Sequence, residues 1–273
     1  MPATESDHRS AAAIATSAGE LLVELRENLE RLQIHPRTAR DEGDRRSHEY
    51  IMDALAREHP DDAVLSEEGV DDPARLSSSR VWIVDPLDGT REFGEPGRID
   101  WAVHVALWQD GELTAGAVAL PAEDRVLSTW RPEPGRQPAH RGEPLRRVVS
   151  RSRPPAFVAR LAAGLGAVEV PMGSAGAKAA AVITGNADAY VHSGGQYEWD
   201  SAAPVAVALA DGLHASRIDG SPLRYNQSDP TLPDILICPA ELAPRLLGAI
   251  AAAMNGGHVP QSFGATTAQG ELF

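Results

Sequence analysis

The chain is poor in cysteine, lysine and aromatic residues, and it contains no long apolar run. Cys238 is the only cysteine among 273 residues, which excludes an internal disulfide and fits a reducing compartment. No apolar stretch reaches the roughly 20 residues that a membrane span requires. The polar, acidic N-terminal residues do not fit a signal peptide. We therefore expect a cytoplasmic protein with no membrane partner.

The charge balance excludes a further class of partner. The net charge is −14 at pH 7, which argues against binding to nucleic-acid polymers. A small phosphorylated ligand stays compatible with this charge, because bound metal ions can invert the local field.

Lys178 is the only lysine among the 25 Lys and Arg residues, which draws attention to its surroundings. The length suffices for one large domain or two subdomains.

The most informative stretch is VWIVDPLDGT, residues 81–90. Its apolar start, rich in β-branched residues, predicts a buried strand, and Asp85 and Asp88 follow at the exit. Carboxylates that converge at a strand end form a hard-oxygen site suited to Mg²⁺. Gly89 and Thr90 can open the next helix, whose free N–H groups bind an anion. The alternative is a turn or helix cap without a function.

Other acidic residues could complete such a site. Glu67 and Glu68 follow a short apolar segment, and one of them could reach a metal beside Asp85; a solvated loop is the alternative. Asp200 starts a predicted helix, either as its N-cap or as a metal ligand from the second half of the chain. Asp44 is either the cap of another helix or a group that polarises a water.

Further residues bear on the kind of ligand and on the reaction mechanism. The small-residue turn from Gly173 to Lys178 opens a predicted helix and offers N–H groups and an ammonium to a second anion. Pro86 stands where the phosphatases of the haloacid dehalogenase type have their nucleophilic aspartate, so that chemistry is excluded for this motif. The nine histidines show no metal-type spacing, and we expect them to be surface or supporting residues.

The remaining pattern alternates helices and strands, which is typical of an α+β or α/β protein. Helices are expected over 9–32, 45–59, 155–163, 175–184, 200–209 and 240–254, and strands over 63–65, 81–84, 101–108, 112–120, 125–130, 145–149, 168–170, 187–191, 213–217 and 235–238. Residues 35–44 and 131–144 are expected to be loops. We expect an α+β subdomain over 1–144 with most metal ligands, an α/β subdomain over 145–254 that completes the cleft, and a flexible tail over 255–273.

In these motifs the chain resembles the lithium-sensitive, Mg²⁺-dependent phosphatases of the inositol monophosphatase superfamily. The resemblance covers about residues 10–250 and depends on Ser66–Glu68, Trp82–Thr90 and Trp199–Ala203. The sequence DGTREF, residues 88–93, is similar to that of the CysQ-type 3′(2′),5′-bisphosphate nucleotidases, above all those of actinobacteria. The resemblance implies the layered αβαβα sandwich of the sugar phosphatases.

The resemblance also implies a role for each site residue. Two Mg²⁺ ions would be held, one by Glu67, Asp85 and the Leu87 carbonyl, the other by Asp85, Asp88 and Asp200. The catalytic residues would be Glu67, Asp44 and Thr90, the last two orienting the attacking water. The substrate would be contacted by Gly89 and Thr90 at the scissile phosphate, by Gly173, Ser174 and Lys178 at the other phosphate or the ribose, and by Tyr225 and Asn226 near the base. The sequence from Arg40 to Asp44 departs from the family pattern, which leaves a third metal and the role of Asp44 open.

The resemblance implies that the activity is hydrolysis of 3′-phosphoadenosine 5′-phosphate to AMP and phosphate, as part of sulfate assimilation. Its 5′-phosphosulfate analogue is a second expected substrate, and Li⁺ an expected inhibitor. Inositol monophosphate and fructose 1,6-bisphosphate are alternative substrates for the same metal site. A non-catalytic phosphonucleotide-binding protein is a further alternative. The resemblance leaves a homodimer open.

Overall fold

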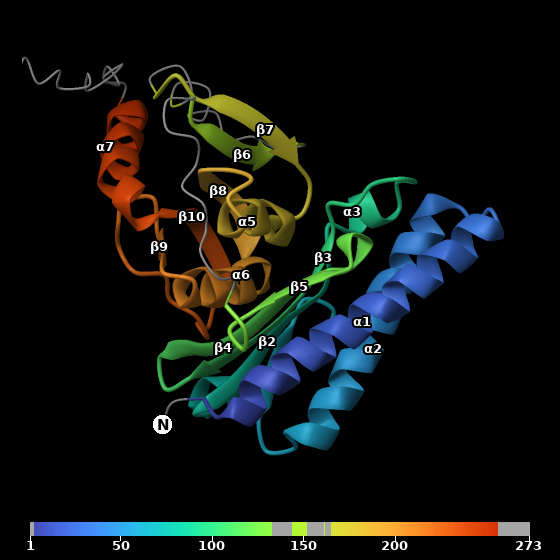
Figure 1. The fold of residues 1–273 in the computed structure, drawn as a ribbon. Helices are drawn as coiled ribbons and strands as arrows, with labels where there is room; N and C mark the ends of the chain where they lie inside the picture. Colours follow the sequence, from blue (N-terminus) through green and yellow to red (C-terminus); the bar gives the residue numbers. More distant parts are fainter. Residues whose placement is uncertain (1–2, 133–143, 152–160, 162–164, 256–273) are drawn as a thin grey trace, which may run out of the picture.

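The computed structural model describes residues 3–132, 144–151, 161 and 165–255. Within these residues the strands form two five-stranded sheets (Figure 1). The first has the order β1-β2-β3-β4-β5, with β1 (Ala63–Ser66), β2 (Arg80–Asp88), β3 (Ala102–Gln109), β4 (Glu112–Leu120) and β5 (Arg125–Ser128). The second has the order β7-β6-β8-β10-β9, with β6 (Arg146–Ser150), β7 (Val168–Met172), β8 (Ala189–Tyr197), β9 (Leu213–Ser216) and β10 (Thr231–Pro239). Both sheets are mixed, because β1 runs parallel to β2 and β6 runs parallel to β7 and β8.

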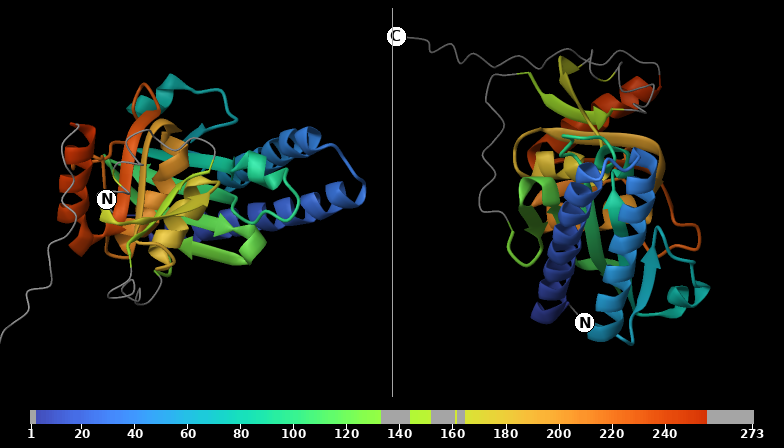
Figure 2. Two further views of the ribbon diagram at one scale, coloured as in Figure 1. Left: turned by 90° about the horizontal axis from the view of Figure 1, so that it is seen from above. Right: turned by 90° about the vertical axis from the view of Figure 1, so that its right-hand side faces the viewer.

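Helices lie between the two sheets and on both outer faces (Figures 1 and 2). The antiparallel pair α1 (Glu5–Arg31) and α2 (Pro36–Glu58) covers the first sheet. Helices α5 (Ala175–Ile183) and α6 (Glu198–Ala210) fill the space between the sheets. Helix α7 (Ala243–Met254) packs on the outer face of the second sheet. The predicted αβαβα sandwich is therefore confirmed.

Helix α6 shows why its sequence suits the middle layer. Its residues from Ser201 to Ala208 are all buried, because one side faces the first sheet and the other side the second. Small side chains allow a close approach: a Cβ at Gly116 of β4 would lie 2.8 Å from the Cβ of Ala206. The helix from the second half of the chain is thereby fixed against the sheet of the first half.

The predicted loop over 35–44 is wrong, since His35 is the N-cap of α2 and residues 36–44 belong to that helix. Pro36 occupies the first helical position, where its missing N–H costs nothing. Gly43 is not a turn residue: a Cβ there would lie 2.8 Å from Phe93 and 2.9 Å from Leu87. It is the point of close contact between α2 and the turn after β2. Asp44 therefore lies within a helix and does not cap one.

Smaller differences concern the ends of elements. Helix α1 begins at Glu5, where Thr4 and Asp7 form a capping box. Strands β8 and β10 are longer than predicted, and β5 ends at Ser128. Short 3₁₀ turns occur at Pro73–Ser77, Pro121–Glu123 and Ala240–Leu242, the last directly before α7.

Some expectations fall on parts of the chain that are not described. The predicted helix over 155–163 except Leu161, most of the loop 131–144 and all but the first residue of the tail 255–273 lie outside the described residues. The division of the chain near residue 144 stays an interpretation. Within the described residues, we find no helix that combines the length and apolar character of a membrane span.

Candidate active site

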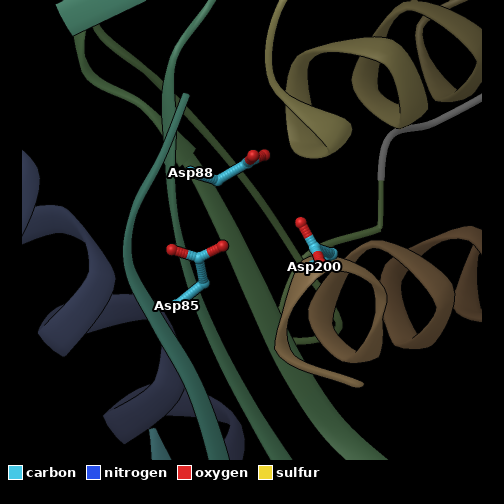
Figure 3. Close-up of side chains that lie close together, drawn as sticks. All are labelled: Asp85, Asp88 and Asp200. Atoms are coloured by element: carbon cyan, nitrogen blue, oxygen red, sulfur yellow. The ribbon is translucent and has the colours of Figure 1, made fainter. Parts of the chain in front are cut away.

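Three aspartates gather where β2 meets the start of α6. Asp85, Asp88 and Asp200 each offer a carboxylate oxygen, and these oxygens lie within 4.8 Å of one another. Figure 3 shows Asp85 and Asp88 on β2 with Asp200 opposite them at the first turn of α6. Asp85 and Asp88 are buried. The two predicted motifs, distant in sequence, therefore meet as a cluster of oxygen ligands.

The end of β2 is shaped to present these groups. Its pairing with β3 is interrupted between Asp85 and Asp88. The two side chains therefore do not follow the regular alternation of a paired strand. The Asp85 carboxylate accepts the Leu87 N–H at 3.1 Å, which folds the chain around Pro86. Ser47 of α2 donates to the Pro86 carbonyl at 2.6 Å, so α2 holds the turn from outside.

Asp200 contributes both to the start of α6 and to the acidic cluster, but the predicted N-cap role is wrong. It is the third residue of α6 and not its N-cap, which is Tyr197. Its Oδ2 accepts the Tyr197 N–H at 2.7 Å and closes the start of the helix. The carboxylate also belongs to the acidic cluster. The capping contact thus fixes the direction in which a cluster residue points.

Thr90 and Asp44 meet beside the cluster. Thr90 begins the short helix α3 (Thr90–Phe93), and Gly89 before it adopts φ = 88°, a conformation that favours glycine. The Thr90 hydroxyl lies 3.2 Å from Asp44 Oδ1 and 3.1 Å from the Leu87 carbonyl oxygen. Burial and the nearby Glu68 raise the pKa of Asp44 to about 7. The structure therefore joins two of the predicted catalytic residues.

The carboxyl groups of the cluster repel one another. Burial and the neighbouring Glu67 and Asp88 raise the pKa of Asp85 well above its usual value. Burial and the Asp88 charge raise the pKa of Asp200 to about 7. Glu67 is exposed as a residue, yet its carboxyl group contacts Asp85; desolvation there, with the other acidic groups, raises its pKa to about 7. Such an excess of negative charge favours a divalent cation.

Asp88 differs from its neighbours because cations and N–H groups surround it. Burial alone would raise its pKa, but His104 and Lys178 lower it to about 2. His104 is fully buried on β3, with Nε2 3.2 Å from Asp88 Oδ2 and Nδ1 3.1 Å from the Trp199 carbonyl oxygen. Sequence reasoning missed this histidine. A lone polar residue in the apolar run WAVHVALW was the signal that could have identified it.

The turn from Gly173 to Lys178 reaches Asp88 from the other sheet layer. Ser174 is the N-cap of α5, and its hydroxyl donates to the Asp88 carboxylate. The N–H groups of Ala175 and Gly176 donate to the same carboxylate at 3.1 and 2.6 Å. The Lys178 ammonium donates to the carbonyls of Gly173 and Ser174, the latter at 2.7 Å. The predicted anion site therefore holds an anion of the protein itself.

A cavity of about 440 Å³ opens over the cluster. Its walls include the predicted residues Glu67, Asp85, Leu87, Asp88, Gly89, Thr90, Gly173, Ser174, Lys178 and Asp200. They also include Tyr190 and Gln196 of β8, which sequence reasoning did not single out. Glu92 of α3 also lines the cavity, and it accepts from Arg151 after β6 at 2.5 Å, a contact that joins the two sheet layers.

Tyr225 and Asn226 are not among the described residues that line this cavity. The Tyr225 hydroxyl lies 3.1 Å from that of Ser201. The Asn226 N–H donates to Glu198 at 2.6 Å, and its Oδ1 accepts from Arg75 at 2.7 Å. These buried contacts fix the loop before β10 against the start of α6, and the expected contact to a substrate base stays a prediction.

Comparison with known proteins agrees with this geometry. The model of the inositol monophosphatase family matches residues 5–255. A 3′-phosphoadenosine 5′-phosphate phosphatase of Mycobacterium bovis is 56% identical over 86% of this chain and 89% of its own length. The 3′(2′),5′-bisphosphate nucleotidase CysQ of Escherichia coli is 31% identical over 78% of this chain and 91% of its own. The crystal structure of CysQ from Bacteroides thetaiotaomicron is 29% identical, with a TM-score of 0.71 over 86% of this chain and 97% of that one. The chain belongs to the inositol monophosphatase family.

Proposed function

We propose that the protein is a Mg²⁺-dependent phosphatase that hydrolyses 3′-phosphoadenosine 5′-phosphate to AMP and phosphate. The observation that carries this proposal is the 56% identity, over 86% of the chain, to the mycobacterial protein named for that activity. The acidic cluster on the cavity wall supports it, because phosphate hydrolysis in a metal-dependent family needs oxygen ligands at one place. A role in sulfate assimilation is part of the proposal.

The residues that would hold the metal fit Mg²⁺. Glu67, Asp85 and the Leu87 carbonyl would hold one ion, and Asp85 with Asp88 and Asp200 a second. All these ligands are oxygens, and burial with mutual repulsion raises the pKa values of Glu67, Asp85 and Asp200, a repulsion that a bound divalent cation would relieve. When bound, Mg²⁺ lowers the pKa of the attacking water and stabilises charge on the leaving oxygen.

The protein's own groups would orient the reactants. The Thr90 hydroxyl, set between Asp44 and the Leu87 carbonyl, would hold the attacking water together with Asp44. The N–H groups of Gly89 and Thr90 would bind the scissile phosphate. Lys178 donates to two carbonyls, and the third N–H of its ammonium would contact the second phosphate or the ribose.

A substrate panel tests the proposal. Phosphate release is measured with Mg²⁺ from 3′-phosphoadenosine 5′-phosphate, its 5′-phosphosulfate analogue, inositol 1-phosphate and fructose 1,6-bisphosphate. The bisphosphate nucleotide should give the highest kcat/KM, and EDTA should abolish its hydrolysis. Faster turnover of the inositol or fructose phosphate would replace the proposed substrate. Binding of the nucleotide without Mg²⁺-dependent turnover would support the non-catalytic alternative. Sedimentation at working concentration would decide whether the protein is a monomer or a homodimer.

A further inference from the structure

Gln196 carries an unpaired polar atom on the cavity wall. Its side chain is only 6% exposed, and its Nε2 donates to the Tyr190 hydroxyl at 2.8 Å. Its Oε1 is buried and has no hydrogen-bond partner among the described residues. Both residues line the cavity that contains the acidic cluster. A buried acceptor without a donor is unfavourable, so its presence on a cavity wall points to a ligand that supplies the donor.

The strand is shaped to place this side chain. Three residue steps of β8, from Ser193 to Gln196, span two steps of β10, which defines a β-bulge. Gly194 and Gly195 within it have φ = 81° and 68°, conformations that side chains rarely adopt. Bulges re-aim side chains near functional sites. Gln196 and the cluster residue Asp200 are four residues apart, at the junction of β8 and α6.

Tyr190 adds a donor to this acceptor. Its ring is buried under the Lys178 ammonium, 5.4 Å away, and burial raises the pKa of its hydroxyl well above the usual value. The phenol therefore stays neutral and keeps its hydrogen while its oxygen accepts from Gln196. The pair offers one acceptor and one donor, which matches a hydroxyl group. If the Oε1 and Nε2 atoms of Gln196 exchanged places, a ligand hydroxyl would still fit, because a hydroxyl can both donate and accept a hydrogen bond.

We propose that Gln196 and Tyr190 form a subsite for the sugar hydroxyl that neighbours the scissile phosphate. This inference rests on the proposed function: with the 3′-phosphate of a nucleoside bisphosphate at the acidic cluster, the neighbouring group is the ribose 2′-hydroxyl. Its hydrogen is donated to Gln196 Oε1, and its oxygen accepts from Tyr190. The subsite makes the protein selective for ribose over 2′-deoxyribose, because the deoxy substrate leaves both groups unpaired.

The test compares kcat/KM for 3′-phosphoadenosine 5′-phosphate and for its 2′-deoxy analogue. We expect the unmodified protein to prefer the ribose substrate at least about tenfold. Gln196→Leu should lower kcat/KM for the ribose substrate and bring the two substrates within about twofold. Tyr190→Phe should reduce the preference in part. Gln109→Leu, which removes another buried strand glutamine at a site outside the described cavity lining, should retain the full preference.

The outcomes separate the two proposals. If neither nucleotide is hydrolysed with Mg²⁺, the proposed function fails. If the unmodified protein hydrolyses both nucleotides equally well, the function stands and the subsite is wrong. Retention of the ribose preference in a folded Gln196→Leu variant, checked by its melting temperature, would also overturn the subsite. The substrate comparison on the unmodified protein needs no variant, so an unfolded variant does not remove the test.

Discussion

The backbone N–H of Gly176 donates to the Asp88 carboxylate at 2.6 Å and ties the start of α5 to the end of β2. Asp88 is therefore more than a candidate metal ligand. Its carboxylate also accepts from Ala175 and from the Ser174 hydroxyl, which are N-terminal groups of a helix in the second half of the chain. One side chain thus serves the acidic cluster and the contact between two layers of the fold.

This double role sets the expected effect of Asp88→Asn. Activity should fall at least about a hundredfold, since an amide replaces a charged ligand. Stability should also fall, by about 1–3 kcal/mol, because the Asn amide presents N–H groups to other N–H groups. Phosphate release and urea unfolding measure the two effects. Asp53→Asn on the exposed face of α2 is the control and should leave both unchanged. A variant with full activity would remove Asp88 from the metal site.

Gly176 should tolerate no side chain. A Cβ at this position would lie 2.1 Å from His104 Nε2 and 3.0 Å from Ala102 Cβ, so either the helix or the histidine must move. We expect Gly176→Ala to lower the free energy of unfolding by about 1–3 kcal/mol and to lower activity by displacing the N–H from Asp88.

Gly248→Ala is the matched control for this substitution. Gly248 lies within α7, and a Cβ there would contact nothing within 4 Å. The substitution should raise stability by about 0.5–1 kcal/mol, since alanine has the higher helix propensity. Urea unfolding of both variants gives the comparison. If the two substitutions changed the free energy of unfolding equally, close packing around Gly176 would not be the reason that this position needs glycine.

Lithium should inhibit the enzyme at concentrations where sodium does not. Li⁺ is a small, hard cation that oxygen ligands can hold, but it carries half the charge of Mg²⁺. It would occupy a place in the acidic cluster without equal polarisation of the reacting groups. Phosphate release is measured against LiCl, with NaCl at the same ionic strength as the control for screening. Coincident inhibition curves for the two salts would argue against the proposed metal ligands.

The local parts of the site are predictable from sequence because they depend on short-range signals. An apolar run that stops at Asp85, a proline one residue later and a small-residue turn before Lys178 all act within a few residues. The structure brings these segments to one cavity, as the motifs indicate.

The parts that sequence reasoning misses depend on pairing between distant segments. His104 reaches Asp88 because β3 runs antiparallel to β2 with Asp85 opposite His104, a register that no local pattern defines. Gly43 resembles a loop signal, yet its small size serves the contact between α2 and Phe93. Gln196 gains its position from a bulge in β8, which also depends on the partner strand.

The acidic cluster makes the stability of the protein depend on pH and Mg²⁺ together. Glu67 and Asp200 have pKa values of about 7 in the folded protein, above their usual values of 4.5 and 3.8. The metal-free folded state therefore binds more protons than the unfolded state between about pH 4 and pH 7. The stability that these groups contribute is present below that window and is lost as the pH rises through 7. Mg²⁺ binds the ionised groups and should reverse the loss at high pH.

Thermal unfolding with EDTA or with Mg²⁺, at about pH 5 and about pH 8, checks this expectation. The gain in melting temperature from Mg²⁺ should be small at the lower pH and large at the higher one. Asp200→Asn removes one of the raised groups, so in EDTA it should lose less stability than the unmodified protein as the pH rises. This comparison cancels the titration of groups remote from the acidic cluster, because both proteins share them. A Mg²⁺ gain that stays constant across this range would show that the cluster is already ionised without metal, and that its repulsion is relieved in another way.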